Sequence, residues 1–341
     1  MSLKILILGI NGFIGSSLLE RALATKASWC FVGLDLNHDK ITPYLQHPDL
    51  VFKQGDMQQE SVWIEQQVQR CDVVLPLAAI ATPAIYVHDP LSVFELDFEA
   101  NLQIVRLCVK HKKRIVFPST SEVYGMCSDT VFDEQTSALV TGPINKSRWI
   151  YASSKQLLDR VIHAYGLRNE LAYTLFRPFN WIGAQLDNPH NPKPGSSRVI
   201  SQFVGNMLRG EAIQLVDGGQ QCRSFIDIDD GIEALIRILA NEQDCAAQRI
   251  FNIGNPGNHI SIFELAHLLL AVVKQHAAPR YATLAESMPI HAVPADSYYG
   301  AGYQDIAHRV PSIQAAKTYL NWQPTITLKE SLRKIVNYHL S

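Results

Sequence analysis

The sequence predicts an α/β protein in which a doubly wound parallel sheet carries a smaller second lobe. As far as about residue 179, apolar β-branched runs alternate with segments of helical period. Such continuous hydrophobic strands are typical of a parallel sheet that is covered by helices on both faces. From Asn180 the alternation gives way to loops rich in proline, glycine and asparagine, such as GAQLDNPHNPKPGSSR. With 341 residues, the chain is long enough for two lobes that share a cleft.

The expected elements follow one another in a regular order. They are the strand KILILG (4–9), the helix SSLLERALA (16–24), the strands CFVGLD (30–35), VFKQGD (51–56) and DVVLPLA (72–78), a long helical segment from Pro90 to Lys112, the strand RIVFPS (114–119), the helix YASSKQLLDRVIHAYG (151–166) and the strand AYTLFRP (172–178). The chain is expected to return to the sheet at IFNIGN (250–255) and to leave it near Ser261. We therefore assign residues 1–179, with returning segments near 224–255, to a dinucleotide-binding domain. Residues 180–341 form mainly a discontinuous substrate-binding lobe.

Composition excludes several classes of protein. The formal net charge of −2 offers no broad cationic face, so nucleic acid is not an expected partner. The one dense basic run, KHKKR (110–114), falls where a helix should end and a strand begin. No run reaches the 18 or more apolar residues of a membrane span. Six cysteines without CxxC spacing indicate reduced thiols and a cytoplasmic protein, and 12 histidines without HxH or HExxH spacing indicate no metal site.

Three glycines after the first strand predict a nucleotide-binding turn. Gly9, Gly12 and Gly15 open directly into a helix, where they permit a tight turn and let a pyrophosphate approach the helix N-terminus. The GxxGxxG spacing differs from the general GxGxxG fingerprint, although the strand before it and the helix after it agree. About 20 residues further on, Asp35 ends the second strand, where a carboxylate accepts the ribose hydroxyls and repels a 2′-phosphate. This favours NAD, and a Rossmann-type fold.

The predicted NAD contacts extend beyond the glycines. They are Gly9, Asn11, Gly12, Phe13, Ile14, Gly15, Asp35, Asp56, Met57, Ala78 and Lys155. Asp56 ends the third expected strand, where contact with the adenine edge and the capping of a loop are equally favoured by the local sequence.

Tyr151 and Lys155 form a candidate acid–base pair. They stand one helical turn apart in YASSK, on the same face of the predicted helix. A lysine beside a tyrosine hydroxyl stabilises the phenolate, which lets the tyrosine exchange a proton with an alcohol. YxxxK is common by chance, but here a dinucleotide turn precedes it, and Thr120 and Ser121 stand at the end of the preceding strand.

These motifs together resemble a known family. In order, GxxGxxG, Asp35, STSEVYG, YASSK and FRPFN are similar to the extended short-chain dehydrogenases/reductases that modify nucleotide sugars. The segments FPSTSEVYGM, GPINKSRWIYASSKQLLDRVI, LFRPFNWIG, LVDGGQQCRSFIDIDDGIEAL and SYYGAGYQDIAHRVPSI resemble UDP-glucuronate decarboxylases. Within that group they resemble the decarboxylase half of the bifunctional polymyxin-resistance enzymes, and next the UDP-xylose synthases. The resemblance covers essentially the whole chain, and the formyltransferase half of the bifunctional enzymes has no counterpart in it.

The resemblance implies the catalytic residues. Oxidation of the C4 alcohol of UDP-glucuronate gives a β-keto acid, which loses carbon dioxide to leave an enolate. Tyr151 is expected to take the C4 hydroxyl proton, with Lys155 holding the phenolate and Thr120 or Ser121 donating to the developing oxyanion. Glu122 and Arg309 match the family's catalytic acid and arginine, and would act around C5 and its carboxylate.

The same resemblance places the substrate and the assembly. The matching UDP-sugar positions are Ala81, Tyr86, Arg148, Asn180, Arg198, Gln214, Arg223 and Tyr303. At Gln214 the family has a lysine, so this position is a departure. The segments Leu91 to Lys112 and Tyr151 to Tyr165 resemble the helix pair of the family's dimer interface, which implies a homodimer.

Three functions stay open on the sequence. A decarboxylase would release UDP-4-ketopentose, which we favour, or return the hydride and yield UDP-xylose. The second possible enzyme is a nucleotide-sugar 4-epimerase or 4,6-dehydratase. Dehydratases of this family carry Asp-Glu where this chain has Ser121-Glu122, which counts against a dehydratase. A non-catalytic NAD-binding module is a third, although degenerate members lose the tyrosine or the lysine, and both are present here.

Overall fold

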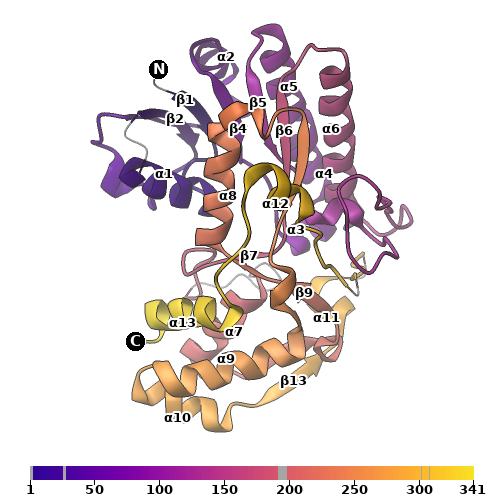
Figure 1. Cartoon of the computed structure of the whole chain (residues 1–341). Helices are drawn as coiled ribbons and strands as arrows, with labels where there is room; N and C mark the ends of the chain where they lie inside the picture. Colours follow the sequence, from indigo (N-terminus) through magenta and orange to yellow (C-terminus); the bar gives the residue numbers. More distant parts are fainter. Residues whose placement is uncertain (1–2, 26–27, 191–197, 301, 307) are drawn as a thin grey trace.

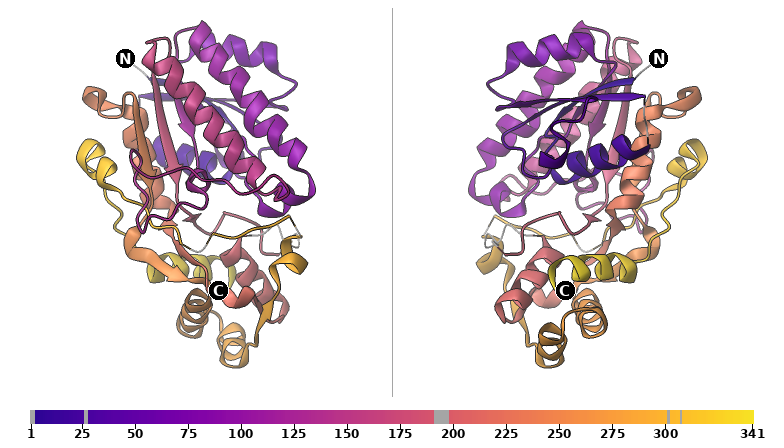
Figure 2. Two further views of the ribbon diagram at one scale, coloured as in Figure 1. Left: turned by 90° about the vertical axis from the view of Figure 1, so that its right-hand side faces the viewer. Right: turned by 90° about the vertical axis from the view of Figure 1, so that its left-hand side faces the viewer.

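The protein has two lobes, seen one above the other in Figure 1 and from both sides in Figure 2. The computed structural model describes residues 3–25, 28–190, 198–300, 302–306 and 308–341. Most of the first half of the chain lies in the upper lobe of Figure 1, and most of residues 198–300 lie in the lower lobe.

The upper lobe is built on a seven-stranded sheet whose pairings are all parallel. From edge to edge the strands are β11 (Arg249–Ile253), β6 (Tyr173–Pro178), β5 (Arg114–Pro118), β4 (Val73–Pro76), β1 (Leu3–Leu8), β2 (Trp29–Asp35) and β3 (Leu50–Gln54). The strand order reverses beside β1, so the connections from β1 and β4 leave toward opposite faces and open a crevice at the carboxyl ends. The predicted Rossmann-type α/β fold is confirmed.

Helices cover both faces of this sheet. One face carries α1 (Phe13–Thr25), α8 (Ile228–Ala240) and α12 (Gln314–Leu320), and the other carries α2 (Ser61–Arg70), α5 (Asn101–Lys110) and α6 (Trp149–Leu167). Strand side chains alternate between the two layers, as a period of two requires. In β1, Ile5 and Ile7 pack with the first set of helices, whereas Leu6 and Leu8 pack with the second.

The long helical segment predicted from Pro90 to Lys112 is interrupted. It consists of α4 (Pro90–Phe94), a π-helical stretch (Glu95–Ala100) and α5. A π-helix is rare and is found mostly as a single wide turn, frequently at a functional site. The basic run lies where it was predicted, because α5 ends at Lys110 and β5 begins at Arg114.

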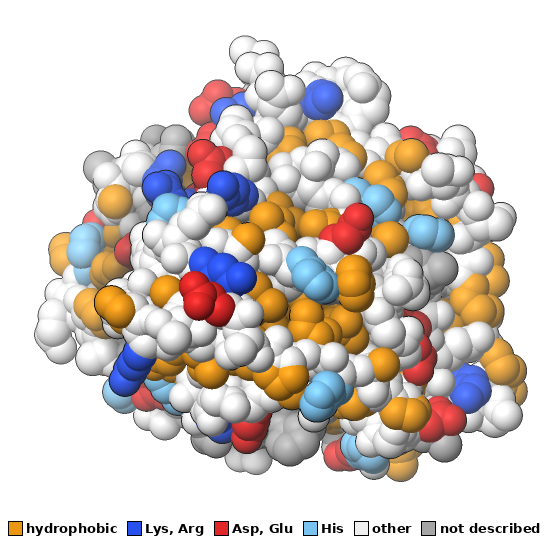
Figure 3. Space-filling view, turned by 90° about the horizontal axis from the view of Figure 1, so that it is seen from below, with side chains coloured by type: hydrophobic (Ala, Val, Ile, Leu, Met, Phe, Trp, Pro, Cys, Tyr) orange, Lys and Arg blue, Asp and Glu red, His pale blue; other side chains and the backbone are white. Residues whose placement is uncertain are grey.

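The lower lobe has a core of its own, made by four helices and a short sheet. These are α7 (Val199–Arg209), α9 (Ile262–His276), α10 (Pro279–Ser287) and α13 (Leu328–His339), with strands β8 (Ile213–Val216) and β13 (Ile290–Val293). Local sequence fixes where α9 and α13 begin. Ser261 with Glu264, and Thr327 with Glu330, form capping boxes that satisfy the first N–H groups of each helix. Seen from below, this face shows a central group of apolar side chains bordered by charged side chains of both signs and by histidines (Figure 3).

Short elements connect the lobes and border the site. They are α3 (Pro83–His88), the 3-10 turn η3 (Ser121–Tyr124), α11 (Ala295–Tyr299), and the strand pairs β7 (Trp181–Ile182) with β10 (Ile226–Asp227) and β9 (Cys222–Ser224) with β12 (His259–Ser261). The lobes are discontinuous in sequence, because α8, β11 and α12 lie in the upper lobe although they follow residue 180. Within the described ranges, no helix is both long and apolar enough to cross a membrane.

Candidate active site

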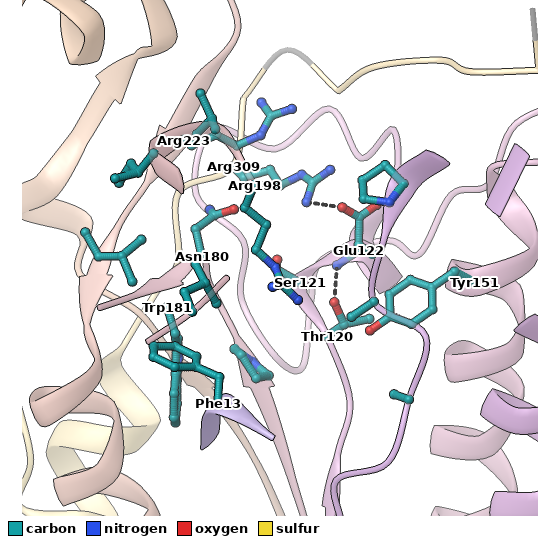
Figure 4. A pocket seen from close by; sticks show the side chains of 18 of the residues that line it. Phe13, Thr120, Ser121, Glu122, Tyr151, Asn180, Trp181, Arg198, Arg223 and Arg309 are labelled. Carbon is teal, nitrogen blue, oxygen red and sulfur yellow. Dashed lines mark hydrogen bonds and ion pairs between the residues drawn. The ribbon is translucent and has the colours of Figure 1, made fainter. Parts of the chain in front are cut away.

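A cavity of about 590 Å³ lies between the lobes, at the carboxyl ends of the central strands. Most of the predicted site residues line it: Gly9, Gly12, Phe13, Ile14, Gly15, Ala81, Tyr86, Thr120, Ser121, Glu122, Arg148, Tyr151, Lys155, Asn180, Arg198, Gln214, Arg223, Tyr303 and Arg309. Figure 4 shows how ten of the lining side chains converge from both lobes. Its volume is in the range of small-molecule sites, about 300–1,000 Å³.

The glycine turn forms the cofactor end of this cavity. Gly9 has a φ of +89°, and a Cβ added there would lie 2.7 Å from the backbone nitrogen of Ala78. A Cβ on Gly15 would lie 2.6 Å from the carbonyl oxygen of Ile10, so only glycine allows α1 to pack this closely on the turn. Gly12 lines the cavity itself, and α1 begins at Phe13, which presents the first helical N–H groups for an anion. The residues present therefore fit the pyrophosphate of a dinucleotide.

Asp35 stands at the end of β2, where its carboxylate holds the glycine turn in place. One oxygen accepts from the backbone N–H of Asn11 at 2.8 Å, and the other accepts from that of Leu36 at 2.8 Å. Burial raises the pKa of Asp35, and the backbone N–H groups oppose that rise. The Asn11 side chain accepts from the backbone N–H of Lys40 at 2.8 Å, so it ties the turn to the loop after β2. Contact of Asp35 with a ribose stays a prediction.

Four predicted cofactor residues besides Asp35 are absent from the described cavity lining: Asn11, Asp56, Met57 and Ala78. Asp56 accepts from the backbone N–H of Gln58 at 2.9 Å, so it caps the loop before α2, which was one of its two expected roles. Met57 is buried in the core beneath that helix. Ala78 packs against Gly9. Contact of these four residues with NAD stays a prediction.

Tyr151 and Thr120 meet at the floor of the cavity. The Tyr151 side chain is hydrogen-bonded to Thr120 and stacks on the ring of Tyr86, with centroids 4.6 Å apart and planes 7° apart. In Figure 4 its hydroxyl points toward Thr120. Burial raises the pKa of Tyr151 well above its usual range, and the Asp97 carboxylate adds to that rise. The sequence predicted the opposite direction, from a lysine acting directly on the phenol.

Lys155 is engaged elsewhere, which explains this difference. Its Nζ donates to the carbonyl of Pro118 at 3.3 Å and lies 3.4 Å from Oδ1 of Asp97. Asp97 is fully buried in the π-helical stretch, and its Oδ2 accepts from the backbone N–H of Ile80 at 2.9 Å. Asp97 lies behind the cavity lining as the buried partner of Lys155, and the sequence analysis did not identify it.

Glu122 lies in the turn η3 that follows β5, between two buried arginines. Its oxygens contact Nη2 of Arg148 at 2.6 Å and Nη1 of Arg309 at 2.5 Å. Burial alone would raise the pKa of Glu122, but the charges of Arg148 and Arg309 outweigh it and lower the pKa to about 2. Glu122 is therefore a carboxylate throughout the neutral range. Sequence positions 122, 148 and 309 are brought together by β5, α6 and the segment before α12.

Both arginines have buried N–H groups without a hydrogen-bond partner among the described residues. Among the described residues, Nε and Nη1 of Arg148 and Nε of Arg309 are buried without a hydrogen-bond partner. One glutamate balances one of the two charges, so the cluster carries a net positive charge in an enclosed place. Burial lowers the pKa of Arg309, as expected for a guanidinium beside two others. An anionic ligand in the adjoining cavity would balance this charge.

The remaining substrate candidates are fixed by partners of their own. Arg223 pairs with Asp305 at 2.5 Å, and Arg198 pairs with Asp187 at 2.6 Å. Tyr303 is buried beside the guanidinium of Arg148, which lies 5.3 Å from its ring centroid. The other three lie at the rim or wall: Ala81 before α3, Asn180 after β6, and Gln214 on β8, where its side chain is exposed. Neither acidic partner, Asp187 nor Asp305, was expected.

A buried polar network supports the turn that carries Glu122. Asp159 on α6 accepts from Ser119 at 2.7 Å and from Arg177 at 3.2 Å. Arg177 donates to the Tyr124 hydroxyl at 2.9 Å, which donates to Asn252 on β11 at 2.8 Å. Through Tyr124, these contacts fasten η3 to β6 and β11, so they help to hold Glu122 in position. Arg177 belongs to the FRPFN motif (176–180), but the motif did not predict its contacts with Asp159 and Tyr124.

The fold and the site define a class of protein: a Rossmann-type dinucleotide-binding fold in which Tyr151 and Lys155 line a cavity beside buried arginines. The model of the NAD dependent epimerase/dehydratase family matches residues 5–254. The chain belongs to this family, whose members act on nucleotide sugars, and NAD is its cofactor.

Solved structures agree with this assignment. The PbgP3 protein from Burkholderia pseudomallei shares 50% identity, with a TM-score of 0.88 over 98% of this chain and 95% of that one. A UDP-glucuronic acid 4-epimerase from Bacillus cereus, solved with UDP-glucuronic acid and NAD, shares 21% identity with a TM-score of 0.79 over 98% of each chain. A dTDP-glucose 4,6-dehydratase from Bacillus anthracis, solved with NAD, shares 20% identity with a TM-score of 0.79 over 99% of this chain and 96% of that one. The last two show the fold alone.

Proposed function

We propose that the protein is an NAD-dependent UDP-glucuronate decarboxylase. The observation that carries this proposal is the pair of buried arginines on one glutamate. Arg148 and Arg309 leave one positive charge uncompensated and several donors unused beside Glu122. A hexuronate carboxylate would supply the missing negative charge and the two acceptor oxygens. A neutral hexose, such as the sugar of UDP-glucose, would leave the charge buried and unpaired.

Tyr151 is the proposed base. Its hydroxyl would take the proton of the C4 alcohol, with Thr120 as its hydrogen-bond partner and Lys155 supporting the site through Asp97. NAD, when bound, would supply the hydride acceptor and a positive charge that opposes the effect of burial on the pKa of Tyr151.

The second half of the reaction follows from the position of the carboxylate. Once C4 is a ketone, the C5 carboxyl group is β to it, and the C5–carboxyl bond can break with its electron pair passing into the ketone. Arg309 and Arg148 would hold the carboxylate in one orientation until carbon dioxide leaves. Glu122 would then stand beside C5, and Ser121 also lines the cavity. The resulting enolate would take up one proton at C5, which balances the proton that Tyr151 removed from the C4 hydroxyl. The products would be UDP-4-ketopentose, carbon dioxide and NADH.

Related proteins support the substrate class. The Bacillus cereus epimerase was solved with UDP-glucuronic acid and NAD, so this fold accommodates both molecules. A 4-epimerase or a 4,6-dehydratase is the alternative within the family, and a non-catalytic NAD-binding module is the alternative outside catalysis. The Arg148–Glu122–Arg309 cluster favours a uronate substrate over the hexose of a dehydratase.

Incubation with NAD and UDP-glucuronate distinguishes these functions. We expect carbon dioxide and NADH in equal amounts, together with UDP-4-ketopentose. Carbon dioxide without net NADH would mean that the hydride returns and UDP-xylose forms. UDP-galacturonate without carbon dioxide would identify an epimerase and contradict the proposal. The absence of any product would also contradict the proposal.

We also propose a homodimer through α4, α5 and α6. Leu91 on α4 and Leu157 on α6 are large apolar side chains that stand exposed, at 69% and 49%, on neighbouring helices. Light scattering should give twice the chain mass of 38.1 kDa. A monomer at micromolar concentration would contradict this interface.

A further inference from the structure

Three potential metal ligands meet outside the cavity. Cys222 on β9, His259 on β12 and His308 each offer one ligand atom, and these atoms lie within 4.8 Å of one another. β9 and β12 are antiparallel, with His259 opposite Ser224, so Cys222 and His259 share one face of this strand pair. Arg223 follows Cys222 on β9, so its side chain points to the other face of the strand pair, where it lines the cavity.

The hydrogen bonds of Ser224 leave a nitrogen of His259 available. The single hydroxyl proton of Ser224 is donated to the carbonyl of Arg309 at 2.9 Å. The Ser224 oxygen must therefore accept from Nδ1 of His259, which lies 3.2 Å away. With its proton on Nδ1, the ring keeps a free lone pair on Nε2. A metal-binding histidine is commonly oriented in this way, by a hydrogen bond on its other nitrogen.

We propose that Cys222, His259 and His308 bind a zinc ion, with water in the fourth position. One thiolate and two imidazoles are a ligand set that zinc favours. Around a tetrahedral zinc, neighbouring ligand atoms are roughly 3.3–3.8 Å apart, so small side-chain rotations suffice. The exposed side chain of His308 gives the ion access from solvent. His259 is within electrostatic range of both Arg223 and Glu264, so one charge of each sign lies nearby.

The sequence predicted no metal site, because it has no HxH or HExxH motif. These ligands come from three segments that are adjacent only in the fold: positions 222, 259 and 308. Spacing rules find ligands on one helix or hairpin, and they cannot detect such a set.

Zinc at this place would act on the segment that carries Arg309. The ion would bind His308 directly, and it would reach the backbone of Arg309 through His259 and Ser224. Arg309 contacts Glu122, and it lies near Arg223 in the wall of the cavity (Figure 4). Zinc would therefore tie the last segment of the site to the β9–β12 pair. The proposal stands independently of which nucleotide sugar the cavity accepts.

Metal titration of the whole protein tests this site without an activity assay. Protein freed of metal with a chelator is titrated with Co²⁺ as a spectroscopic probe, then with Zn²⁺. We expect one equivalent of Co²⁺, a thiolate-to-cobalt charge-transfer band, displacement by Zn²⁺, and a higher unfolding temperature with Zn²⁺. Cys222→Ser should abolish the band, and Ser224→Ala should weaken Zn²⁺ binding by about 10- to 100-fold. His259→Ala and His308→Ala should weaken it further.

Two control variants replace a cysteine and a histidine outside the proposed zinc site. Cys245→Ser changes a partly buried thiol elsewhere, and His267→Ala removes an exposed histidine from α9; both should bind the ions like the parent. Circular dichroism shows whether each variant is folded. A parent protein without a thiolate band, or a folded Cys222→Ser variant that binds Zn²⁺ as tightly as the parent, would overturn the site.

Discussion

Replacing Arg309 by alanine is expected to reduce the decarboxylation rate by about 10²- to 10³-fold, which corresponds to the loss of roughly 3–4 kcal/mol from a buried charge pair. The guanidinium contacts Glu122 at 2.5 Å and is the proposed anchor of the sugar carboxylate. NAD binding should change little, because the glycine turn lies at the other end of the cavity. The measurement is carbon dioxide release under saturating NAD, with NAD affinity determined in parallel.

The charges that remain in the cluster distinguish a loss of activity in Arg309→Ala from a loss of folding. Without Arg309, Glu122 and Arg148 remain as a neutral pair, so the loss of stability should be small. Glu122→Ala, in contrast, leaves two buried cations without an anion and should destabilise the fold by about 3–5 kcal/mol. Arg168→Ala removes an exposed arginine and serves as the control. An Arg309→Ala variant that decarboxylates at the parent rate would show that Arg309 does not hold the substrate.

Tyr151→Phe should lower kcat by roughly 10²- to 10⁴-fold, the usual contribution of a positioned acid–base group. The substitution removes only the hydroxyl that is hydrogen-bonded to Thr120, and the ring can keep its stacking on Tyr86. Stability and NAD affinity should therefore stay close to those of the parent. Single-turnover formation of NADH measures the effect directly.

A tyrosine on the same helix provides the control for that substitution. Tyr165 lies further along α6, outside the cavity lining, so Tyr165→Phe should keep the parent kcat. A Tyr151→Phe enzyme that retains a tenth or more of the parent kcat would exclude Tyr151 as the base.

The fold could be predicted from local pattern because each strand of a parallel sheet is itself an apolar run. The glycine turn and the Tyr151–Lys155 spacing are likewise local, since their parts lie within a few residues of one another. The sequence left the role of a side chain open where two local uses were possible. Asp56 could cap a loop or contact a base edge. The structure shows the cap, through the hydrogen bond from Gln58, and contact with a base edge stays a prediction.

What the sequence could not reveal depends on long-range contacts. Asp97 is buried in a π-helical stretch, where its carboxylate meets Lys155, and no residue pattern announced that stretch. The same limit applies to the Asp305 partner of Arg223 and to the network around Arg177. The low pKa of Glu122 needs two arginines from distant segments, and the raised pKa of Tyr151 needs the burial that only the closed cavity provides.

The fate of the carboxyl carbon tests the central claim most directly. UDP-glucuronate labelled with ¹³C at C6 is incubated with the protein and NAD, and both the gas and the nucleotide sugars are followed by NMR and mass spectrometry. The cluster of Arg148, Glu122 and Arg309 predicts that the label leaves entirely as carbon dioxide and that a pentose nucleotide remains. Label retained in a six-carbon UDP-sugar would contradict the decarboxylase assignment.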